Sequence, residues 1–418
     1  MAFPCGSGRR WSRAIKMTFY LFFLIPMSSA GNRNTNTIFG KKQKLEVQQQ
    51  LKRLNKPALK SIEKMYLIQS PDGDIIDCVD IYKQPAFDHP LLKNHTIQMR
   101  PSSYPEGFSF DEINDISANS EPKFTQPWHL NGRCPEGTIP IRRTKEEDLL
   151  RAGSVANFGR KKYPHAQKNV DPDVHEHAIY IEDGDKYYGM TAEINVWNPH
   201  TQEVNEFSAS QFWLTSGEYG QDFDSIEAGM TVCENIYRDK ETRIFVYWTD
   251  DAYQSTGCLN LDCPGFVQVD HQIVMGARVT PYSKYDGDQI GLKFYVWKDV
   301  NAGGNWWLKI GNIKLGYWPS SIFSLLSDSA SSVQWGGEVI NYNKNGQHTT
   351  TQMGSGHFAE EGPRKASFFK YLNVIDGSQI TRGPRDTRTF MTKPNCYNII
   401  DYGGFFYFGG PGRNPNCP

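Results

Sequence analysis

The C-terminal part of the chain is dominated by a two-residue alternation of side-chain character. Ile290, Leu292, Phe294 and Val296 alternate with Gly291, Lys293, Tyr295 and Trp297. Successive side chains of a β-strand point to opposite faces, so this period predicts strands with one face in a core. The balance of 37 Gly with 24 Phe, 21 Tyr and 10 Trp fits many short strands joined by tight turns. We therefore expect residues 168–418 to form an all-β, antiparallel two-sheet sandwich.

Two local features within this region give specific expectations. Residues 177–181 and 187–197 flank Asp183-Gly184, which predicts a β-hairpin. Ser320 or Ser321 can cap a helix whose apolar stripe would be Ile322, Leu325, Leu326 and Ala330. Strand-like patterns are also found at residues 243–248 and 306–318.

Residues 31–167 differ in composition, because they are rich in charged residues and interrupted by proline. Leu45, Leu51 and Leu54 recur at helical spacing, and residues 75–79 resemble a strand. A smaller, mixed α/β unit is the expectation. From 144 to 168 the chain is basic and low in large apolar residues. This composition fits an exposed linker open to proteolysis, and equally an ordinary surface loop.

The first 30 residues have the pattern of a secretory signal peptide. Arg9, Arg10, Arg13 and Lys16 precede a short apolar core at residues 17–27, and Ser28-Ser29-Ala30 offers small residues for cleavage. No later segment is long and apolar enough to span a bilayer. We expect a secreted protein, destined for the extracellular space, the cell wall or the vacuole, with no membrane partner. A net charge of −1 over 418 residues also argues against a nucleic-acid partner.

Cysteine spacing supports an oxidising compartment. Once Cys5 leaves with the signal peptide, seven cysteines remain, which is an odd set. Proximity favours the pairs Cys258–Cys263 and Cys396–Cys417, with Cys78–Cys134 in the N-terminal part and Cys233 left over, although sequence alone leaves other pairings open. Asn94-His95-Thr96 is a glycosylation sequon that would be used in the secretory pathway.

Two glutamates stand in settings that are unusual for a charged residue. Glu227 and Glu338 are each flanked by glycine and apolar or aromatic residues, with no basic neighbour in sequence. Poor solvation raises the pKa of a carboxyl group, and two such groups in one cleft would share a proton in mild acid. Alternation places Glu227 on a small polar face with Gly229 and Cys233, opposite a core face that includes Met230. The competing interpretation is a solvated outer face.

Other constellations of reactive residues are weaker. The segment His175-Glu176-His177 lacks further ligands at metal-binding spacing and is interpreted as a surface segment. His348 and His357 could be a base and its helper, or structural histidines. Cys233 is interpreted as an inert thiol, because Glu234 beside it disfavours a thiolate. We expect no metal and no cofactor.

The sequence resembles the neprosin family of secreted plant glutamic peptidases, which are made as zymogens. The resemblance covers nearly all of the chain after residue 30. It is carried by segments such as Ser70–Val79, Gln84–Leu92, Ile226-Glu227-Ala228-Gly229, Trp335-Gly336-Gly337-Glu338-Val339 and Thr351–Phe358. Met230 and Cys233-Glu234 depart from the family, which commonly has Trp and Ser-Pro at these positions.

The resemblance implies a β-sandwich with a cleft across one sheet and Glu227 and Glu338 as the catalytic pair. The family's prototype cuts after proline under acid conditions, so the implied substrate is a proline-containing peptide or protein. Residues 31–167 would be an activation peptide that inhibits its own catalytic domain, residues 168–418. Candidates to line an apolar proline pocket are Trp213, Tyr253, Trp306 and Trp307. A monomer is expected.

Two alternatives use the same residues differently. A secreted β-sandwich without activity could bind cell-wall carbohydrate through exposed aromatic side chains. Paired carboxylates also serve glycosidases. Loss of peptide cleavage after substitution of both glutamates separates the peptidase from the binder, and release of reducing sugar would identify the glycosidase.

Overall fold

A computed structural model describes residues 33–62, 73–107, 125–152, 154–161, 174–301 and 303–418. The chain divides into two compact units, Met1–Leu45 and Glu46–Pro418. Within the first, the described residues belong to helix α1 (Arg33–Leu54). The predicted signal peptide lies outside the described residues. No helix among the described residues is long and apolar enough to cross a membrane.

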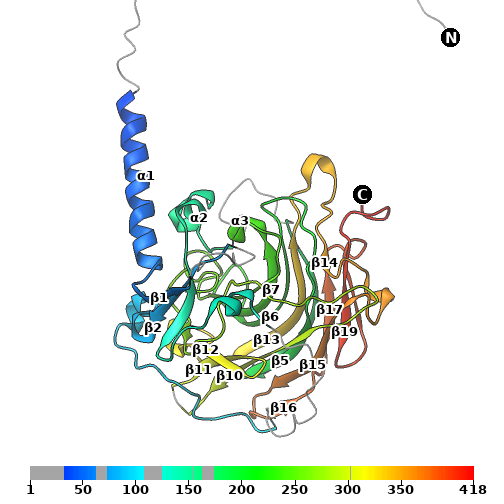
Figure 1. The fold of residues 1–418 in the computed structure, drawn as a ribbon. Coiled ribbons are helices and arrows are strands. Elements are labelled where there is room, and N and C mark those ends of the chain that lie inside the picture. The colour runs from blue at the N-terminus through cyan, green and yellow to red at the C-terminus, as the bar shows by residue number, and fades with distance from the viewer. Residues whose placement is uncertain (1–32, 63–72, 108–124, 153, 162–173, 302) are drawn as a thin grey trace, which may run out of the picture. The chain divides into compact units, whose positions relative to one another are not determined.

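The second unit contains two large antiparallel sheets (Figure 1). The six-stranded sheet has the order β17 (Arg388–Met391), β4 (His175–Tyr187), β13 (Ala330–Ile340), β6 (Phe207–Gly217), β7 (Phe223–Cys233), β8 (Arg243–Thr249). The ten-stranded sheet runs β14 (Met353–Gly354), β19 (Phe406–Gly410), β15 (Ser367–Ile375), β5 (Gly189–Asn195), β10 (Gly291–Asp299), β11 (Asn305–Ile310), β12 (Ile313–Trp318), β9 (Val267–Gln268). Two short strands, β16 (Thr381–Arg382) and β18 (Asn398–Asp401), pair with β15 and β19.

The main hydrophobic core takes side chains from both sheets. Phe212 and Ile226 come from the six-stranded sheet, and Phe294 and Trp306 come from the ten-stranded sheet; all four are buried in one cluster. The rings of Phe212 and Phe294 meet edge to face, with centroids 6.0 Å apart. The predicted two-sheet β-sandwich is confirmed. Met230 is 3% exposed within this core, on the face that alternation predicted.

The predicted hairpin around Asp183-Gly184 is wrong. Strand β4 runs through this dipeptide to Tyr187 and pairs with β13 and β17, whereas β5 pairs with β10 and β15 in the other sheet. The β4–β13 pairing is irregular opposite this point, between Ala330 and Ser332. A bulge accommodates turn-forming residues inside a strand, so long-range pairing prevailed over local turn preference.

The predicted helix after Ser320 is also wrong. Only a 3₁₀ turn, η9 (Ser320–Ile322), forms there. Asp224 of β7 accepts hydrogen bonds from the backbone N–H groups of Leu325 and Leu326, at 2.7 and 2.9 Å, and from the Ser324 hydroxyl. A side chain that takes these backbone donors offers the segment an alternative to helical hydrogen bonding.

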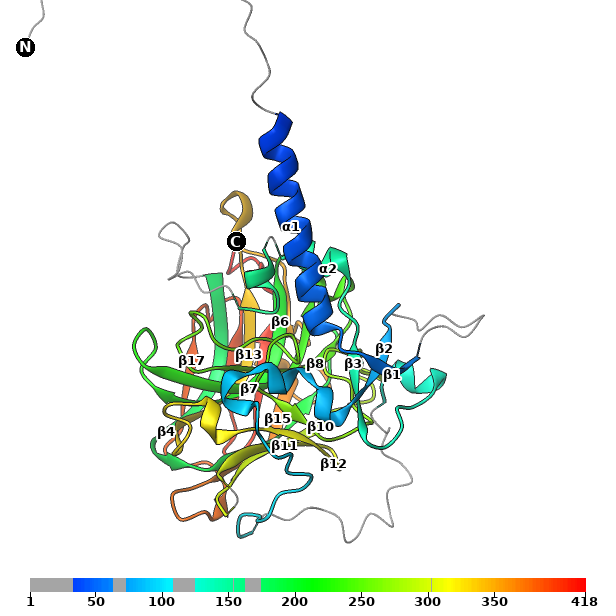
Figure 2. The ribbon, with the colours of Figure 1, turned by 90° about the vertical axis from the view of Figure 1, so that its left-hand side faces the viewer.

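The N-terminal part of the second unit is mixed α/β, as expected. Strands β1 (Ala58–Ile62), β2 (Ile76–Asp80) and β3 (Thr138–Arg142) form a separate antiparallel sheet, visible in Figure 2. The helical elements among the described residues of the whole second unit, besides the end of α1, are α2 (Glu146–Arg151), α3 (Glu234–Tyr237) and the 3₁₀ turns η1 (Ile81–Lys83), η2 (Pro85–Asp88), η3 (Pro90–Leu92), η5 (Pro127–Asn131), η6 (Val155–Asn157), η9, η10 (Lys344–Gly346) and η11 (Ala359–Glu361). Val79, Ile139 and Ile141 join the core cluster of the sandwich, so this sheet packs against it.

The structure contains the three expected disulfides. They join Cys78 to Cys134, Cys258 to Cys263 and Cys396 to Cys417. Cys233 is a free, buried thiol. Burial raises the pKa of Cys233 to about 11, which keeps the group protonated and unreactive near neutral pH. The interpretation of Cys233 as an inert thiol agrees with this environment.

Candidate active site

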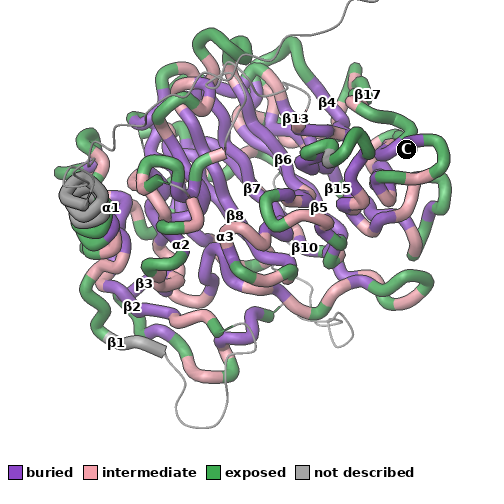
Figure 3. Tube along the Cα trace, turned by 90° about the horizontal axis from the view of Figure 1, so that it is seen from above, coloured by how far each residue is buried: buried purple, intermediate pink, exposed green. Residues whose placement is uncertain are grey.

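Glu227 and Glu338 lie on the same face of the six-stranded sheet, on strands β7 and β13. Figure 3 looks onto this sheet, where β6 separates the two strands. Their neighbours Ile226, Ala228 and Val339 point into the core, so both glutamates point away from it. Each carboxylate is nevertheless fully buried. The sheet thus brings together two residues that are 111 positions apart in sequence (338 − 227).

One lysine joins the two carboxylates. Lys161 Nζ lies 2.5 Å from Glu227 Oε2 and 3.0 Å from Glu338 Oε2. The lysine side chain is 8% exposed. Its ammonium also lies over the ring of Tyr247, 5.5 Å from the centroid. A buried cation between two buried anions offsets part of their charge, and it occupies the space between the two groups.

The backbone before Lys161 is held in place by several contacts. Phe158 is buried in a cluster with Val47 and Leu149. Gly159 has φ +69, and a Cβ there would lie 2.8 Å from the Cβ of Asp262, so only glycine fits. Its carbonyl accepts a hydrogen bond from the Leu259 N–H at 2.7 Å. The Lys161 N–H then donates to the Tyr247 hydroxyl at 3.1 Å. These contacts aim the lysine at the two glutamates.

The remaining contacts of Glu338 differ from those of Glu227. Glu338 Oε1 lies 2.7 Å from His175 Nδ1 and 3.8 Å from His177 Nε2. Gln211 Nε2 donates to Glu338 Oε2 at 2.5 Å.

Besides Lys161, Glu227 has two hydroxyl groups as hydrogen-bond partners among the described residues. The Ser225 hydroxyl donates to Glu227 Oε1 at 3.1 Å, and the Tyr253 hydroxyl donates to the same oxygen at 2.7 Å. Apart from Lys161, Glu227 therefore has hydroxyl donors, whereas Glu338 has imidazole and amide groups.

Electrostatics at the site follow from these contacts. Burial alone would raise the pKa of Glu338, but Lys161 and His175 outweigh it and hold that pKa well below its ordinary range. Burial alone would lower the pKa of Lys161, but Glu227 and Glu338 raise it above the ordinary lysine value. Burial lowers the pKa of His177 to about 4, against the attraction of Glu338. The structure therefore contains ionised Glu338, charged Lys161 and neutral His177 at neutral pH.

Three expectations need correction here. The pKa of Glu338 is lowered rather than raised, because a cation that is remote in sequence lies beside it. The stretch 144–168 is not uniformly exposed: Glu146–Arg151 is helical and Lys161 is buried in the site. The segment His175–His177 is not a surface segment, because His175 is 7% exposed and both histidines face Glu338.

The four aromatic candidates separate in the structure. Tyr253 contacts Glu227 through its hydroxyl. Trp213 lies opposite Glu227 in the β6–β7 register and packs against Ile179 and Ile181. Trp306 is buried in the core between the sheets, and Trp307 in a separate cluster with Trp297 and Tyr317. Trp306 and Trp307 thus belong to the ten-stranded sheet and not to the face with the glutamates, so their prediction as pocket residues is wrong.

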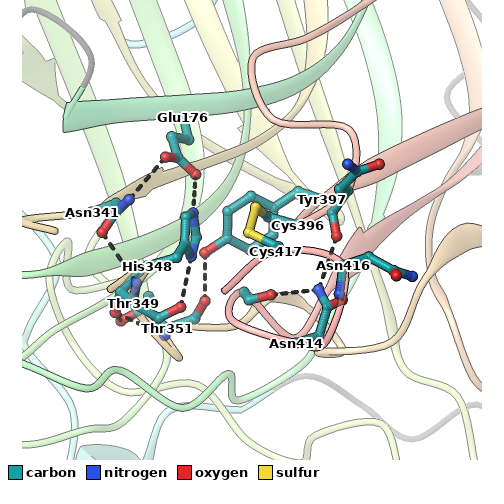
Figure 4. The surroundings of a disulfide bond; sticks show 12 residues. Glu176, Asn341, His348, Thr349, Thr351, Cys396, Tyr397, Asn414, Asn416 and Cys417 are labelled. Atoms are coloured by element: carbon teal, nitrogen blue, oxygen red, sulfur yellow. Dashed lines mark hydrogen bonds and ion pairs between the residues drawn. A yellow bond between two sulfur atoms is a disulfide. The ribbon is translucent and has the colours of Figure 1, made fainter. Parts of the chain in front are cut away.

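His348 and His357 take structural positions. His348 Nε2 lies 2.7 Å from Glu176, and its ring contacts Tyr397 beside the Cys396–Cys417 disulfide (Figure 4). His348 and these two sulfurs lie close enough to hold a metal ion, but the sulfurs are bonded to one another and cannot act as thiolate ligands. His357 pairs with Glu361 near the surface. Among the described residues, the side-chain hydrogen bonds of these two histidines go to Thr349, Glu176 and Glu361 and not to Glu227 or Glu338.

Sequence reasoning missed Lys161, Gln211 and the contacts of His175. Gln211 lies at the centre of the site on β6, opposite Gly229 of β7 and Gly336 of β13. Alternation along β6 could have placed it there once the strand order was known. The signal for His175 was available, since positions 175 and 177 share one face of a strand. Lys161 carries no local pattern, because its partners are 66 and 177 residues away.

A cavity of about 310 Å³ adjoins the site. Gln211 and Lys161 line it at the glutamates, and it extends over an apolar stretch of the same face formed by Phe207, Ala209, Cys233, Phe245 and Tyr247. Residues of the N-terminal part, among them Ala152 and Phe158, line its other side. An apolar pocket with a few polar groups at one end is a typical ligand site.

Comparison with known proteins connects both parts of the chain to one family. Residues 204–411 match the neprosin family model, and residues 67–181 match the neprosin activation peptide. Two structures of scytalido-glutamic peptidase with transition-state analogues align at TM-score 0.33, with 12% and 11% identity, over 56% of this chain and 96% and 97% of theirs. The structure of SCP-B, an eqolisin-family peptidase bound to the tripeptide Ala-Ile-His, aligns at TM-score 0.31 with 10% identity, over 56% of this chain and 96% of that one. The two family models place the chain in the neprosin family of peptidases, with the family's activation peptide preceding its catalytic region.

Proposed function

We propose that the chain is the zymogen of a glutamic endopeptidase that acts in acid and cuts after proline, with Glu227 and Glu338 as its catalytic pair. The observation that carries this proposal is the burial of both carboxylates on one sheet face, joined by Lys161 of the activation region. A buried ion pair is expensive to assemble, and such perturbed groups gather at functional sites. Acid activity and the preference for proline come from the family resemblance.

The different surroundings of the two glutamates suggest their roles. Glu338 keeps contacts with the His175 imidazole and the Gln211 amide, so it would take a proton from a water molecule at the scissile carbonyl. Glu227 keeps hydroxyl donors from Ser225 and Tyr253. In its protonated form it would stabilise the developing oxyanion and then pass its proton to the leaving amine. Water is the nucleophile, and no covalent intermediate is needed.

Latency would rest on Lys161. While its ammonium lies between the carboxylates, water and substrate cannot reach both of them. Acid would weaken this contact by protonating Glu338, whose pKa Lys161 and His175 hold well below its ordinary value. Its stabilising contribution is present above its ordinary pKa of about 4.5 and is lost as the pH falls through the lowered value. The activation region would then leave, or be cut within residues 162–173, which lie outside the described residues.

The cavity beside Glu227 and Glu338 is the proposed binding site for the proline ring of the substrate. Its apolar stretch over Ala209 and Phe245 suits a compact apolar side chain. Cys233 takes part in its wall where the family commonly has serine, so the pocket of this chain is its own. We also propose that the chain is secreted after removal of residues 1–30 and carries a glycan on the exposed Asn94. In this proposal the protein is a monomer.

Mass spectrometry after an acid shift tests this function. The purified chain is moved from neutral pH to about pH 4, near the ordinary carboxylate range, with a peptide that contains one proline. We expect loss of the N-terminal part and a single cut after the proline, with none in a matched peptide that has alanine in its place. Cuts unrelated to proline would remove the specificity, and an intact chain and peptide at every pH would point to a binding protein.

A further inference from the structure

Gln211 lies on strand β6, between the strands that carry the two glutamates. In the strand register it stands opposite Gly229 on one side and Gly336 on the other. At both positions a Cβ would collide with neighbouring backbone, so only glycine fits beside this side chain. The side chain itself is fully buried. The sheet therefore presents one amide group between the carboxylates with no side chain directly beside it on either strand.

Only one end of this amide is used within the described part of the chain. Gln211 Nε2 donates to Glu338 Oε2 at 2.5 Å. Glu338 is ionised and can only accept hydrogen bonds, so this contact fixes the direction of the amide. Gln211 Oε1 then points away from the carboxylate, and it has no hydrogen-bond partner among the described residues. A buried carbonyl oxygen without a donor is uncommon in folded proteins and calls for a missing donor.

The cavity beside Gln211 indicates where this donor would come from. Gln211 and Lys161 line the cavity at the two glutamates, and the adjoining Ala209, Phe207 and Phe245 have no donor in their side chains. Donors such as Thr231 and Tyr247 also line the cavity, but no described residue donates a hydrogen bond to Gln211 Oε1. A ligand that fills this space must therefore bring its own donor next to an apolar group. The backbone of a peptide has this chemistry, because each residue other than proline carries one N–H group. Proline has none, so the donor must belong to a residue flanking it in the chain.

We propose that Gln211 is a substrate-binding residue of the peptidase, in which Nε2 holds Glu338 while Oε1 accepts a backbone N–H of the bound peptide next to the scissile bond. This role of Gln211 rests on the proposed function, and it adds a third residue to the site formed by Glu227 and Glu338. One amide would then align the base and the substrate together. The competing role is purely structural, in which Gln211 only positions Glu338 and Oε1 has no ligand.

Removal of single N–H groups from the substrate separates these two roles. A peptide with one cleaved proline bond is prepared in versions N-methylated at one backbone nitrogen at a time, on each side of that bond. Each version is measured with the acid-activated wild-type enzyme and with Gln211→Met, which keeps the shape but neither hydrogen bond. At one position we expect methylation to lower kcat/KM of the wild-type enzyme about tenfold, the cost of one hydrogen bond, and to have far less effect on Gln211→Met.

The control variant is Gln334→Met. Gln334 is a partly buried glutamine of β13 on the same face, and its amide donates to Ser332 rather than to a glutamate. It should show the wild-type pattern of methylation costs. If every methylated peptide loses the same factor with wild-type enzyme and Gln211→Met, Gln211 is a positioning residue only and the proposal is overturned.

The wild-type enzyme alone also decides the question, should Gln211→Met fail to fold. Insensitivity to methylation at every flanking nitrogen would overturn the role of Gln211 while leaving the peptidase intact. Absence of cleavage of the unmethylated peptide would instead refute the proposed function, and the role of Gln211 with it. The two failures are therefore distinguishable in one set of assays.

Discussion

Lys161 Nζ lies 2.5 Å from Glu227 Oε2, at the centre of a contact that also includes Glu338 at 3.0 Å. The lysine belongs to the segment that matches the activation peptide, and the glutamates belong to the sandwich. In the proposed zymogen, the activation region and the site would thus be joined by charge as well as by shape. A lock of this kind, an ammonium held between two carboxylates, depends on the ionisation of its partners and would connect latency to pH without a separate sensor.

Substitution of Lys161 tests the lock directly. In Lys161→Ala two buried carboxylates lose their shared cation, which should cost about 3–5 kcal/mol of unfolding free energy near neutral pH. One glutamate should then bind a proton at higher pH, and the activation region should leave in weaker acid. The readouts are denaturant unfolding and the midpoint pH of processing. Arg160→Ala, which changes an exposed neighbour, serves as the control; an unchanged midpoint in Lys161→Ala would contradict the lock.

His177 should make the stability of the chain depend on pH. Burial lowers its pKa to about 4, so between this value and about 6.5 the unfolded chain binds a proton that the folded chain does not. The free energy of unfolding should therefore fall as the pH drops through this window. The loss should not exceed about 3 kcal/mol, since the His177 side chain is 23% exposed.

This window can be measured in the Glu227→Gln background, which should prevent self-processing. Denaturant unfolding is followed from about pH 7 to about pH 4, with and without His177→Gln. The His177→Gln substitution should make the free energy of unfolding nearly independent of pH between about pH 6.5 and about pH 4. The loss of stability that comes from Glu338 below about pH 4.5 should remain. Equal slopes in both variants would show that His177 is not held neutral.

The ion pair of Asp74 with Arg243 should anchor the activation region. Arg243 is fully buried, and its Nη1 lies 2.6 Å from Asp74 Oδ2. Asp74→Asn weakens the compensation of this charge and should destabilise the zymogen by about 3 kcal/mol. The exposed pair of Asp183 with Arg388 provides the contrast, since Asp183→Asn should cost less than about 1 kcal/mol. Urea unfolding of both variants measures the two losses of unfolding free energy. Equal losses would show that the Asp74–Arg243 ion pair does not anchor the activation region.

The fold illustrates what local sequence can and cannot predict. Alternation located β10 and placed Glu227 opposite the core-facing Met230, because the period of a strand is a local property. The hairpin at Asp183-Gly184 failed because β4 obtains its hydrogen bonds from β13, about 150 residues later. Turn residues could not reveal that competition.

The candidate site shows the same limit more sharply. Each glutamate could be selected from its glycine-rich, apolar neighbours, and the family resemblance selected the same two residues. Lys161 could not be selected in this way, because a basic stretch of sequence is ordinarily exposed to solvent. Only the folded structure shows that its side chain lies between the two glutamates. The lowered pKa of Glu338 follows from this single contact and its imidazole neighbour, so the predicted direction of the shift was wrong for the same reason.

The free thiol gives a prediction independent of activity. Cys233 is buried and its pKa is raised to about 11, so the native chain should not react with iodoacetamide near neutral pH. After denaturation without reduction, the peptide that contains Cys233 should become alkylated while the six disulfide-bonded cysteines stay protected. Mass spectrometry of both samples decides this. Rapid alkylation of the native chain would show that the Cys233 thiol is accessible to solvent.

The central claim is that Glu227 and Glu338 are the catalytic pair, and the most direct test is the rate of cleavage of a proline peptide at about pH 4 by single glutamine variants. Glu227→Gln and Glu338→Gln should each lower kcat at least about a hundredfold, the typical effect of losing a general acid or base. Glu206→Gln removes an equally buried carboxylate outside the site and should keep its activity. Near-normal rates in either dyad variant, with a folded chain, would contradict the account.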